Sequence, residues 1–244
     1  MTFESAFDLI DYHYQAEVWK RHDTFERTDS YVEQINEFAK ALTLTEKESS
    51  HFGVFISGLC GNGKTTLIKA FRSAVSDLDK TYNAFAEDMQ KTHKRYDVNI
   101  IEARKLTHLA KKEDDMYYKL MDCNILCIDD CGIGPAETMS WGNVMSPVEE
   151  ILEYRYEKQL FTVITSNLTP PEFSAKYGGR IKSRLLGMMY QIAFSGEDNR
   201  AHKYEESQYM EVAASINPGY ETGNDAVNVD TVVSAFMDNE LEPF

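Results

Sequence analysis

The chain has 244 residues, of which 43% are hydrophobic and 12% aromatic, and this is enough for one sizeable core. It holds no run of eighteen apolar residues, and its first twenty residues carry acids where a secretory signal would carry basic side chains. We therefore expect a cytoplasmic protein without a membrane partner, and we exclude the membrane-spanning and secreted classes.

The net charge of −15 is concentrated at the two ends of the sequence. Residues 1–50 hold 5 basic and 11 acidic side chains, residues 201–244 hold 1 and 9, and residues 51–200 hold 19 and 20. This distribution argues against general adhesion to nucleic acid but allows a local basic surface. We predict an N-terminal helical segment over 1–50, a central domain over 51–200, and an acidic tail over 201–244 that is partly disordered.

Two helices are predicted in the N-terminal segment. Residues 3–20 place apolar side chains at helical spacing, and Ser30-Tyr31-Val32-Glu33 has the pattern of a capping box that opens a second helix. These helices either pack on the central domain or dock a partner.

Residues 58–65 match the phosphate-binding pattern G-x-x-x-x-G-K-[ST]. An apolar run at 51–57 predicts a buried strand before this loop, and the spacing at 66–75 predicts a helix after it. Lys64 would reach the β- and γ-phosphates, and the Thr65 hydroxyl would hold Mg²⁺. The alternative is a glycine-rich turn without a ligand, and the spacing does not fit the dinucleotide fingerprint. The predicted triphosphate site comprises Gly58, Leu59, Cys60, Gly61, Asn62, Gly63, Lys64, Thr65 and Thr66.

A second strand is predicted at 96–103, followed by a charged helix or a pair of short helices at 105–120. Residues 91–119 hold eight basic and five acidic side chains. This stretch is either an ordinary solvated face or a surface for nucleic acid.

The next apolar run, residues 124–130, ends in Asp129 and Asp130. A buried strand would deliver both carboxylates to the edge of a parallel sheet where ligands bind. Asp129 would contact Mg²⁺ directly or through water, and Asp130 would polarise the attacking water. The alternative is an ordinary turn at the end of a strand, and the P-loop earlier in the chain weakens it.

The four cysteines, Cys60, Cys123, Cys127 and Cys131, do not form a disulfide framework in a chain of this length. Cys123 and Cys127 would lie about 13 Å apart on one face of a strand, which is too far for one zinc ion to bridge. We therefore expect Cys123, Cys127 and Cys131 to be core thiols.

Residues 132–143 are expected to form a loop, after which Ser146-Pro147-Val148-Glu149 opens a helix with a capping box and a first-turn proline. A further strand at 160–166 ends in Thr165-Ser166-Asn167. Asn167 would hold the attacking water or the γ-phosphate, unless it is only a turn residue that ends the strand.

The remaining elements are short. Thr169–Glu172 predicts the cap of a helix, Arg180 and Arg184 share one helical face, and residues 191–195 predict the last strand. The two arginines are either a solvated basic face or a functional pair.

Taken in this order, the motifs resemble those of the AAA+ ATPases, and more narrowly the DnaC-type helicase loaders and their IstB relatives. The resemblance covers about residues 50–200 and is strongest over 151–200, where an Arg-Tyr helix and a strand ending in T-S-N precede R-I-x-x-R and G-x-x-x-R. It implies a three-layer α/β P-loop NTPase fold, with a five-stranded parallel sheet in the AAA+ strand order and helices on both faces. The sequence departs from the family in one respect. Only the acidic tail follows Arg200, so we expect the lid domain to be absent or minimal.

The resemblance also implies roles for the residues that match its motifs. Residues 58–65 are Walker A, Asp129 and Asp130 are Walker B, and Asn167 is sensor 1. Arg184 best matches the arginine finger, which acts on ATP in a neighbouring subunit, with Arg180 as the second candidate. Arg200 matches sensor 2, and the insertion between the second and third strands would face DNA.

Several functions stay open. The first is an ATPase that is slow as a monomer, self-associates through an ATP-bridged interface, and loads or remodels a replicative helicase on single-stranded DNA. The second is the same ATPase, similar to IstB, assisting a transposase or phage recombination. The third is a P-loop small-molecule kinase, although the sequence shows neither an arginine-rich lid nor an acceptor pocket. The fourth is a scaffold that binds ATP but barely cleaves it.

Overall fold

The structure is a computed structural model that describes residues 2–21, 23–44, 50–88, 96–140 and 143–195. These residues belong to a unit spanning Met1–Asn199, and the second unit, Arg200–Phe244, lies outside the described residues. The predictions for Arg200, for the acidic tail and for the missing lid therefore also lie outside them.

A five-stranded sheet, parallel throughout, forms the middle layer. The strand order is β2-β3-β6-β1-β7. The strand before the P-loop, β1, therefore lies inside the sheet between β6 and β7. The predicted five-stranded parallel sheet and the AAA+ strand order are confirmed. The strands are β1 (Gly53–Gly58), β2 (Val98–Glu102), β3 (Ile125–Cys131), β6 (Phe161–Ser166) and β7 (Met189–Phe194).

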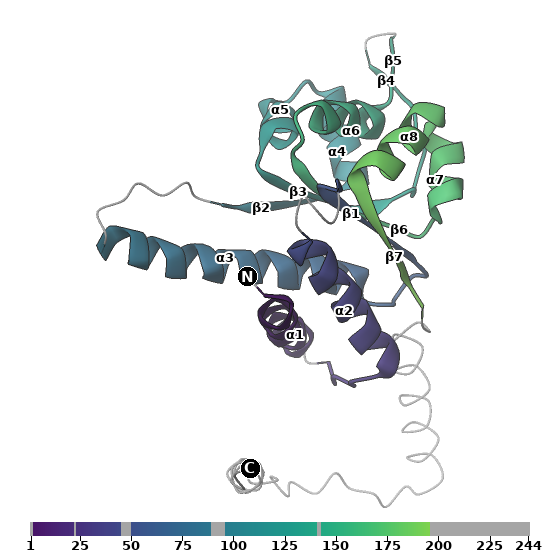
Figure 1. Ribbon diagram of the computed structural model, residues 1–244. Coiled ribbons are helices and arrows are strands. Elements are labelled where there is room, and N and C mark those ends of the chain that lie inside the picture. The colour runs from purple at the N-terminus through teal and green to yellow at the C-terminus, as the bar shows by residue number, and fades with distance from the viewer. Residues whose placement is uncertain (1, 22, 45–49, 89–95, 141–142, 196–244) are drawn as a thin grey trace, which may run out of the picture. The chain divides into compact units, whose positions relative to one another are not determined.

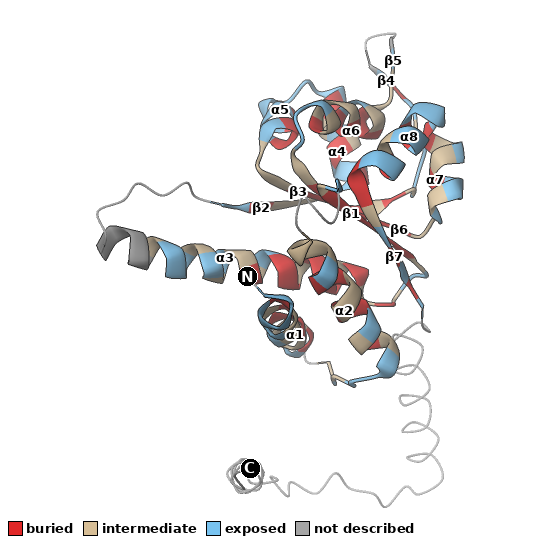
Figure 2. Ribbon diagram, viewed as in Figure 1, coloured by how far each residue is buried: buried red, intermediate tan, exposed pale blue. Residues whose placement is uncertain are grey.

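Helices cover both faces of this sheet, so its inner strands β1, β3 and β6 are mostly buried (Figures 1 and 2). Successive side chains of β1 show the two layers, because Phe55 packs with one hydrophobic cluster and Val54 and Ile56 pack with the other. The first cluster is completed by α4 (Ala103–Lys111), α5 (Asp115–Asp122), α6 (Pro147–Glu157), α7 (Pro170–Tyr177) and α8 (Gly179–Met188).

The second cluster is built from the N-terminal helices and the helix that follows the P-loop. Ile10 and Phe38 pack in it with Leu67, so the N-terminal helices share a core with the sheet. Its helices are α1 (Phe3–Trp19), α2 (Asp29–Thr43) and α3 (Lys64–Asp88). No helix in the described ranges is both long enough and apolar enough to cross a membrane.

Some local predictions were wrong. Two short strands, β4 (Thr138–Ser140) and β5 (Asn143–Met145), form an antiparallel pair (Figure 1). β4 lies inside residues 132–143, which were expected to be a loop, and β5 begins where that stretch ends. The capping box expected at Ser30 does not form, because Thr28 caps α2 and the Ser30 hydroxyl donates to the Ser195 carbonyl instead.

The caps of the later helices agree better with the sequence. Pro147 lies in the first turn of α6 as predicted, but Ser146 makes no capping bond with its side chain. The capping box before α7 is confirmed, and the Thr169 N–H donates to the Glu172 carboxylate at 2.8 Å.

Candidate nucleotide-binding site

The P-loop connects the C-terminal end of β1 to the first turn of α3. Gly58, Gly61 and Gly63 have φ angles of 154°, 80° and 92°, which residues with a side chain rarely adopt. A Cβ atom on Gly58 would lie 2.7 Å from the Phe194 carbonyl oxygen, and a Cβ atom on Gly63 would overlap the Tyr14 hydroxyl. Glycine at these positions allows the loop to curl tightly between β7 and α1.

The ammonium group of Lys64 is directed back into this loop. Its Nζ lies 2.8 Å and 2.6 Å from the carbonyl oxygens of Gly58 and Leu59, and 3.0 Å from Asn62 Oδ1. Lys64 is only 5% exposed. The first N–H groups of α3 have no partner within the helix, and the helix dipole is positive at this end. A fixed cation and these N–H groups together make a site for an anion such as a phosphate chain.

Thr65 and Asp129 are far apart in the sequence and in contact in the structure. The Thr65 hydroxyl donates to the Asp129 carboxylate, with 3.0 Å to Oδ2 and 3.3 Å to Oδ1. The Thr165 hydroxyl donates to the same carboxylate, which is buried. Hydroxyl and carboxylate oxygens are ligands that Mg²⁺ prefers, so this donor set fits a magnesium ion beside the phosphates.

The end of β3 has a bulge after Ile128, and Asp130 lies in it with a φ angle of 55°. The Asp130 N–H donates to Thr165 Oγ1 at 3.0 Å. In a regular strand, Asp129 and Asp130 would point to opposite faces of the sheet, and a bulge changes these directions. The Thr165 hydroxyl thus ties both Walker B acids to β6, a role that the sequence did not reveal.

Asn167 follows β6, which pairs with β1 in parallel. Its Nδ2 lies 3.1 Å from Cys60 Sγ, the third residue of the P-loop. The structure therefore brings the strand-tip amide predicted from the sequence into contact with Walker A.

The two arginines expected at a subunit interface lie on α8. Arg184 Nη2 is 3.1 Å from Glu153 Oε1, and the Arg184 guanidinium lies 5.6 Å from the centroid of the Tyr156 ring. Both partners are on α6, so Arg184 is held against its own chain here. Arg180 is exposed, and Arg200 lies outside the described residues.

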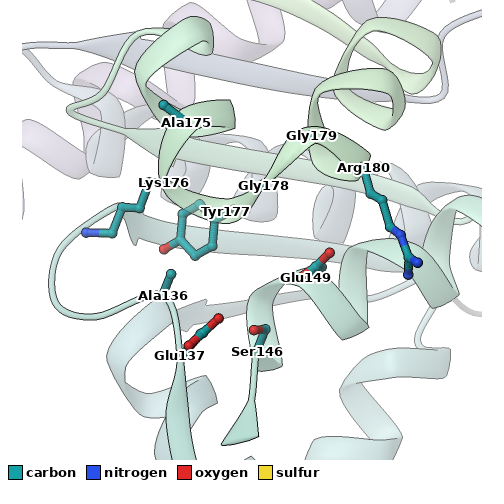
Figure 3. Close-up of a pocket in the computed structure, with 10 residues that line it drawn as sticks. All are labelled: Ala136, Glu137, Ser146, Glu149, Ala175, Lys176, Tyr177, Gly178, Gly179 and Arg180. Atoms are coloured by element: carbon teal, nitrogen blue, oxygen red, sulfur yellow. The ribbon is translucent and has the colours of Figure 1, made fainter.

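Arg180 lines a separate pocket of about 320 Å³. In Figure 3, Glu137 and Glu149 lie on one side of this pocket, and Lys176 and Arg180 lie on the other. Lys176 Nζ donates to the Gly132 carbonyl at 2.6 Å, which ties the end of α7 to the loop after Walker B. The lining residues lie outside the P-loop, so we do not place the nucleotide in this pocket.

Helix α1 and the residues just after it supply contacts that the sequence did not predict. Arg21 donates to the Thr66 hydroxyl at 2.8 Å, and the Tyr14 hydroxyl lies against Gly63. The seven-residue spacing of Tyr14 and Arg21 indicated a common helical face, but no pattern indicated that this face meets the P-loop.

Solved structures with the same arrangement are known, although no protein-family profile and no curated protein matches the sequence. A protein described as a primosome component from Streptococcus pyogenes serotype M3 aligns at 16% identity over 70% of this chain and 82% of its own, with a TM-score of 0.52. The DnaC helicase loader aligns at 16% identity over 70% of this chain and 94% of its own, with a TM-score of 0.50. The fold is the one seen in the DnaC helicase loader. At these identities the likeness shows the fold alone, and it agrees with the resemblance seen in the sequence.

The cysteines provide a chemical test of the candidate nucleotide-binding site. Cys127 and Cys131 are buried, and burial raises the pKa of both thiols, whereas Cys60 is exposed in the P-loop. The core-thiol prediction is confirmed for Cys127 and Cys131, and Cys123 is half-buried. Because only the thiolate reacts, we expect iodoacetamide to alkylate Cys60 first, and saturating ATP with Mg²⁺ to slow this reaction about tenfold or more.

Peptide mass spectrometry over a time course measures both rates, and a Cys60→Ser variant identifies the reactive position. Alkylation of Cys60 at the same rate with and without ATP would contradict nucleotide binding over this loop.

Proposed function

We propose that this protein is an ATPase that binds ATP with Mg²⁺, hydrolyses it to ADP and phosphate, and uses the cycle to load or remodel a replicative helicase on single-stranded DNA. The observation that carries the proposal is the contact between Thr65 and Asp129, with Lys64 fixed in the adjacent loop. A phosphate-binding loop beside a preformed pair of magnesium ligands is what triphosphate chemistry requires.

Each group at the sheet edge has a defined task in this reaction. Lys64 and the N–H groups of the loop hold the β- and γ-phosphates, and Thr65 and Asp129 hold the metal. The metal, when bound, neutralises charge that develops on the phosphate oxygens. Asp130 polarises the attacking water, and the Asn167 amide positions that water or the γ-phosphate.

DNA binding is proposed for the helices between β2 and β3. Arg104, Lys105, Lys111 and Lys112 are exposed on or just after α4. Lys105 also pairs with Glu102 at 2.9 Å, so part of this charge is balanced locally. Binding through such side chains rests on contacts with the phosphate backbone, and it should weaken as salt rises.

The fold shared with the DnaC helicase loader supports the proposal of a helicase as the partner. We propose that residues 51–200 form the ATPase domain, that the helices of residues 1–50 are available for docking, and that the acidic tail at 201–244 is a separate segment. A transposase in place of the helicase is the main alternative partner.

A phosphate-release assay with and without single-stranded DNA tests the reaction. The proposal predicts release of free phosphate that depends on Mg²⁺ and is slow for the monomer. Transfer of phosphate to a small acceptor without release would show a kinase instead, and binding without turnover would show a nucleotide-dependent scaffold. Recovery of a transposase, and no helicase, from native extract with ATP would overturn the helicase role.

We propose Arg184 as the group that acts on ATP in a neighbouring subunit, with Arg180 as the second candidate. Arg184→Ala should leave ATP affinity unchanged and lower turnover by about 10³-fold, because an arginine finger stabilises only the transition state. Lys182→Ala is the matched control, since Lys182 is exposed on the same helix. Its turnover should remain at the wild-type value.

The trans role is tested by mixing Arg184→Ala with a Lys64→Ala variant. The Lys64 variant still carries the arginine, and the Arg184 variant still binds ATP, so mixed assemblies should recover part of the turnover. Failure to recover activity at any mixing ratio would contradict the trans role. It would leave Arg184 as a packing residue held by Glu153 and Tyr156.

A further inference from the structure

The face of α1 that is buried against α3 ends beside the P-loop. Ile10, Tyr14 and Val18 lie on this face and are at most 8% exposed. Arg21 follows Tyr14 by seven residues, about two helical turns, and lies just beyond the end of α1. Tyr14 and Arg21 are thus presented together at the start of α3.

Their contacts are with Gly63 of the P-loop and with Thr66, which directly follows the loop. Arg21 Nη2 donates to Thr66 Oγ1 at 2.8 Å, and Thr66 is only 4% exposed. The Tyr14 hydroxyl packs against Gly63, and burial raises its pKa while Arg21 and Thr66 act in the opposite direction. One polar cluster at the start of α3 therefore comprises Tyr14, Arg21 and Thr66.

The positive charge of Arg21 lies at an end of α3 that favours anions. Its guanidinium contacts Thr66 in the first turn of α3, where the helix dipole is positive, two residues after Lys64. Its carboxylate neighbour is Asp23, whose Oδ2 is 3.7 Å from Arg21 Nε, and both side chains are partly exposed. Such a pair offsets little of this repulsion. A phosphate chain in the P-loop would offset much more.

The position of Thr66 places Arg21 on a different side of the first turn of α3 from Asp129. Asp129 contacts Thr65 from β3, whereas Arg21 reaches Thr66 from α1. Consecutive helical residues project about 100° apart, so the two groups approach the first turn from different directions. The metal ion and the γ-phosphate are expected on the side of the first turn of α3 that faces Asp129.

We propose that Arg21 is a nucleotide-binding residue that contacts the phosphate next to the ribose. A bound nucleotide would then be in direct contact with the N-terminal segment. This inference rests on the proposed ATP site. Since that phosphate is common to ATP and ADP, Arg21 stabilises both nucleotides equally. A guanidinium can hold a phosphate with two parallel hydrogen bonds, which a lysine cannot reproduce.

The test compares the Kd values of ATP and ADP, measured with Mg²⁺ by calorimetric titration, for wild type, Arg21→Ala, Arg21→Lys and Arg27→Ala. Arg27 is the matched control, because it lies in the same segment, pairs with Asp11 at 3.0 Å, and has a side chain 49% exposed against 47% for Arg21. Melting temperatures without nucleotide show whether each variant remains folded.

Arg21→Ala should raise the Kd values of ATP and ADP by the same factor, about tenfold. Arg21→Lys should raise both Kd values by less than this, and Arg27→Ala should raise them by less than twofold. Unchanged affinities for Arg21→Ala would overturn the inference, and so would a loss confined to ATP, which would place Arg21 at the γ-phosphate. An equal loss for Arg27→Ala would also overturn it, because loosening of α1 would then explain the effect. If wild type binds neither nucleotide, it is the proposed function that fails.

Discussion

Lys64→Ala should abolish measurable ATP binding and turnover while the protein remains folded. The ammonium lies within 3.0 Å of three oxygen acceptors inside the P-loop, and it is the cation that would meet the β- and γ-phosphates. Removing it leaves the loop without its central charge, and we expect affinity for ATP to fall at least a hundredfold. Calorimetric titration and a phosphate-release assay measure the two effects.

The control for this variant is Lys80→Ala. Lys80 is an exposed lysine on the same helix, and its partner is Asp77 at 3.0 Å. The Lys80→Ala variant should bind and hydrolyse ATP as the wild-type protein does. Normal turnover by Lys64→Ala would refute the assignment of the site, whatever the Lys80 variant does.

Replacement of Arg155 should have the largest effect on stability. Arg155 is fully buried on α6, and burial lowers the pKa of its guanidinium, which nevertheless stays charged. Its Nε donates to Thr162 Oγ1 at 2.8 Å, and its Nη atoms donate to backbone carbonyl oxygens at the end of α5, before β3 and at the start of β6. These acceptors are the carbonyl groups of Leu120, Met121, Cys123, Asn124 and Phe161.

Arg155→Met keeps most of the volume but removes every donor, so several buried carbonyl groups lose their partner. We expect a loss of about 3–5 kcal/mol in the free energy of unfolding. For a domain of this size, that loss corresponds to a melting temperature lower by about 6–20 °C, measured by calorimetry. The control is Arg104→Met, at an exposed position on α4, which should shift the melting temperature by less than about 2 °C. Equal melting temperatures for the two variants would contradict a structural role for Arg155.

The sheet and the central site were accessible from the sequence because their signals are local. The apolar run at 51–57, the glycines of the loop and the helical spacing that follows all indicate the same strand–loop–helix unit. The acids at 129 and 130 end a second apolar run, and parallel strands bring such ends to one edge. The contact between Thr65 and Asp129 agrees with that reasoning.

The features that the sequence did not reveal depend on contacts between distant segments. Arg155 is charged and was not expected in the core, and its acceptors are mostly backbone carbonyl groups, which no side-chain pattern records. Ser30 looked like a helix cap, but its hydroxyl bonds to Ser195, a residue 165 positions away. The β4–β5 hairpin is too short for a clear alternation of polar and apolar residues.

The meeting of α1 with the P-loop was missed for a related reason. Helical spacing shows which face of residues 3–20 is apolar, but it does not show which surface that face covers. Arg21 follows the apolar face, so its contact with Thr66 depends on how α1 lies on α3.

A crystal structure with Mg²⁺ and a non-hydrolysable ATP analogue would show whether Lys64, Thr65 and Asp129 meet on one magnesium–triphosphate. We expect one metal ion about 2.1 Å from Thr65 Oγ1. Asp129 should reach this ion directly or through one water, and Lys64 Nζ should lie on the β- and γ-phosphates. A nucleotide bound away from residues 58–66, or a metal ion that contacts neither Thr65 nor Asp129, would contradict it.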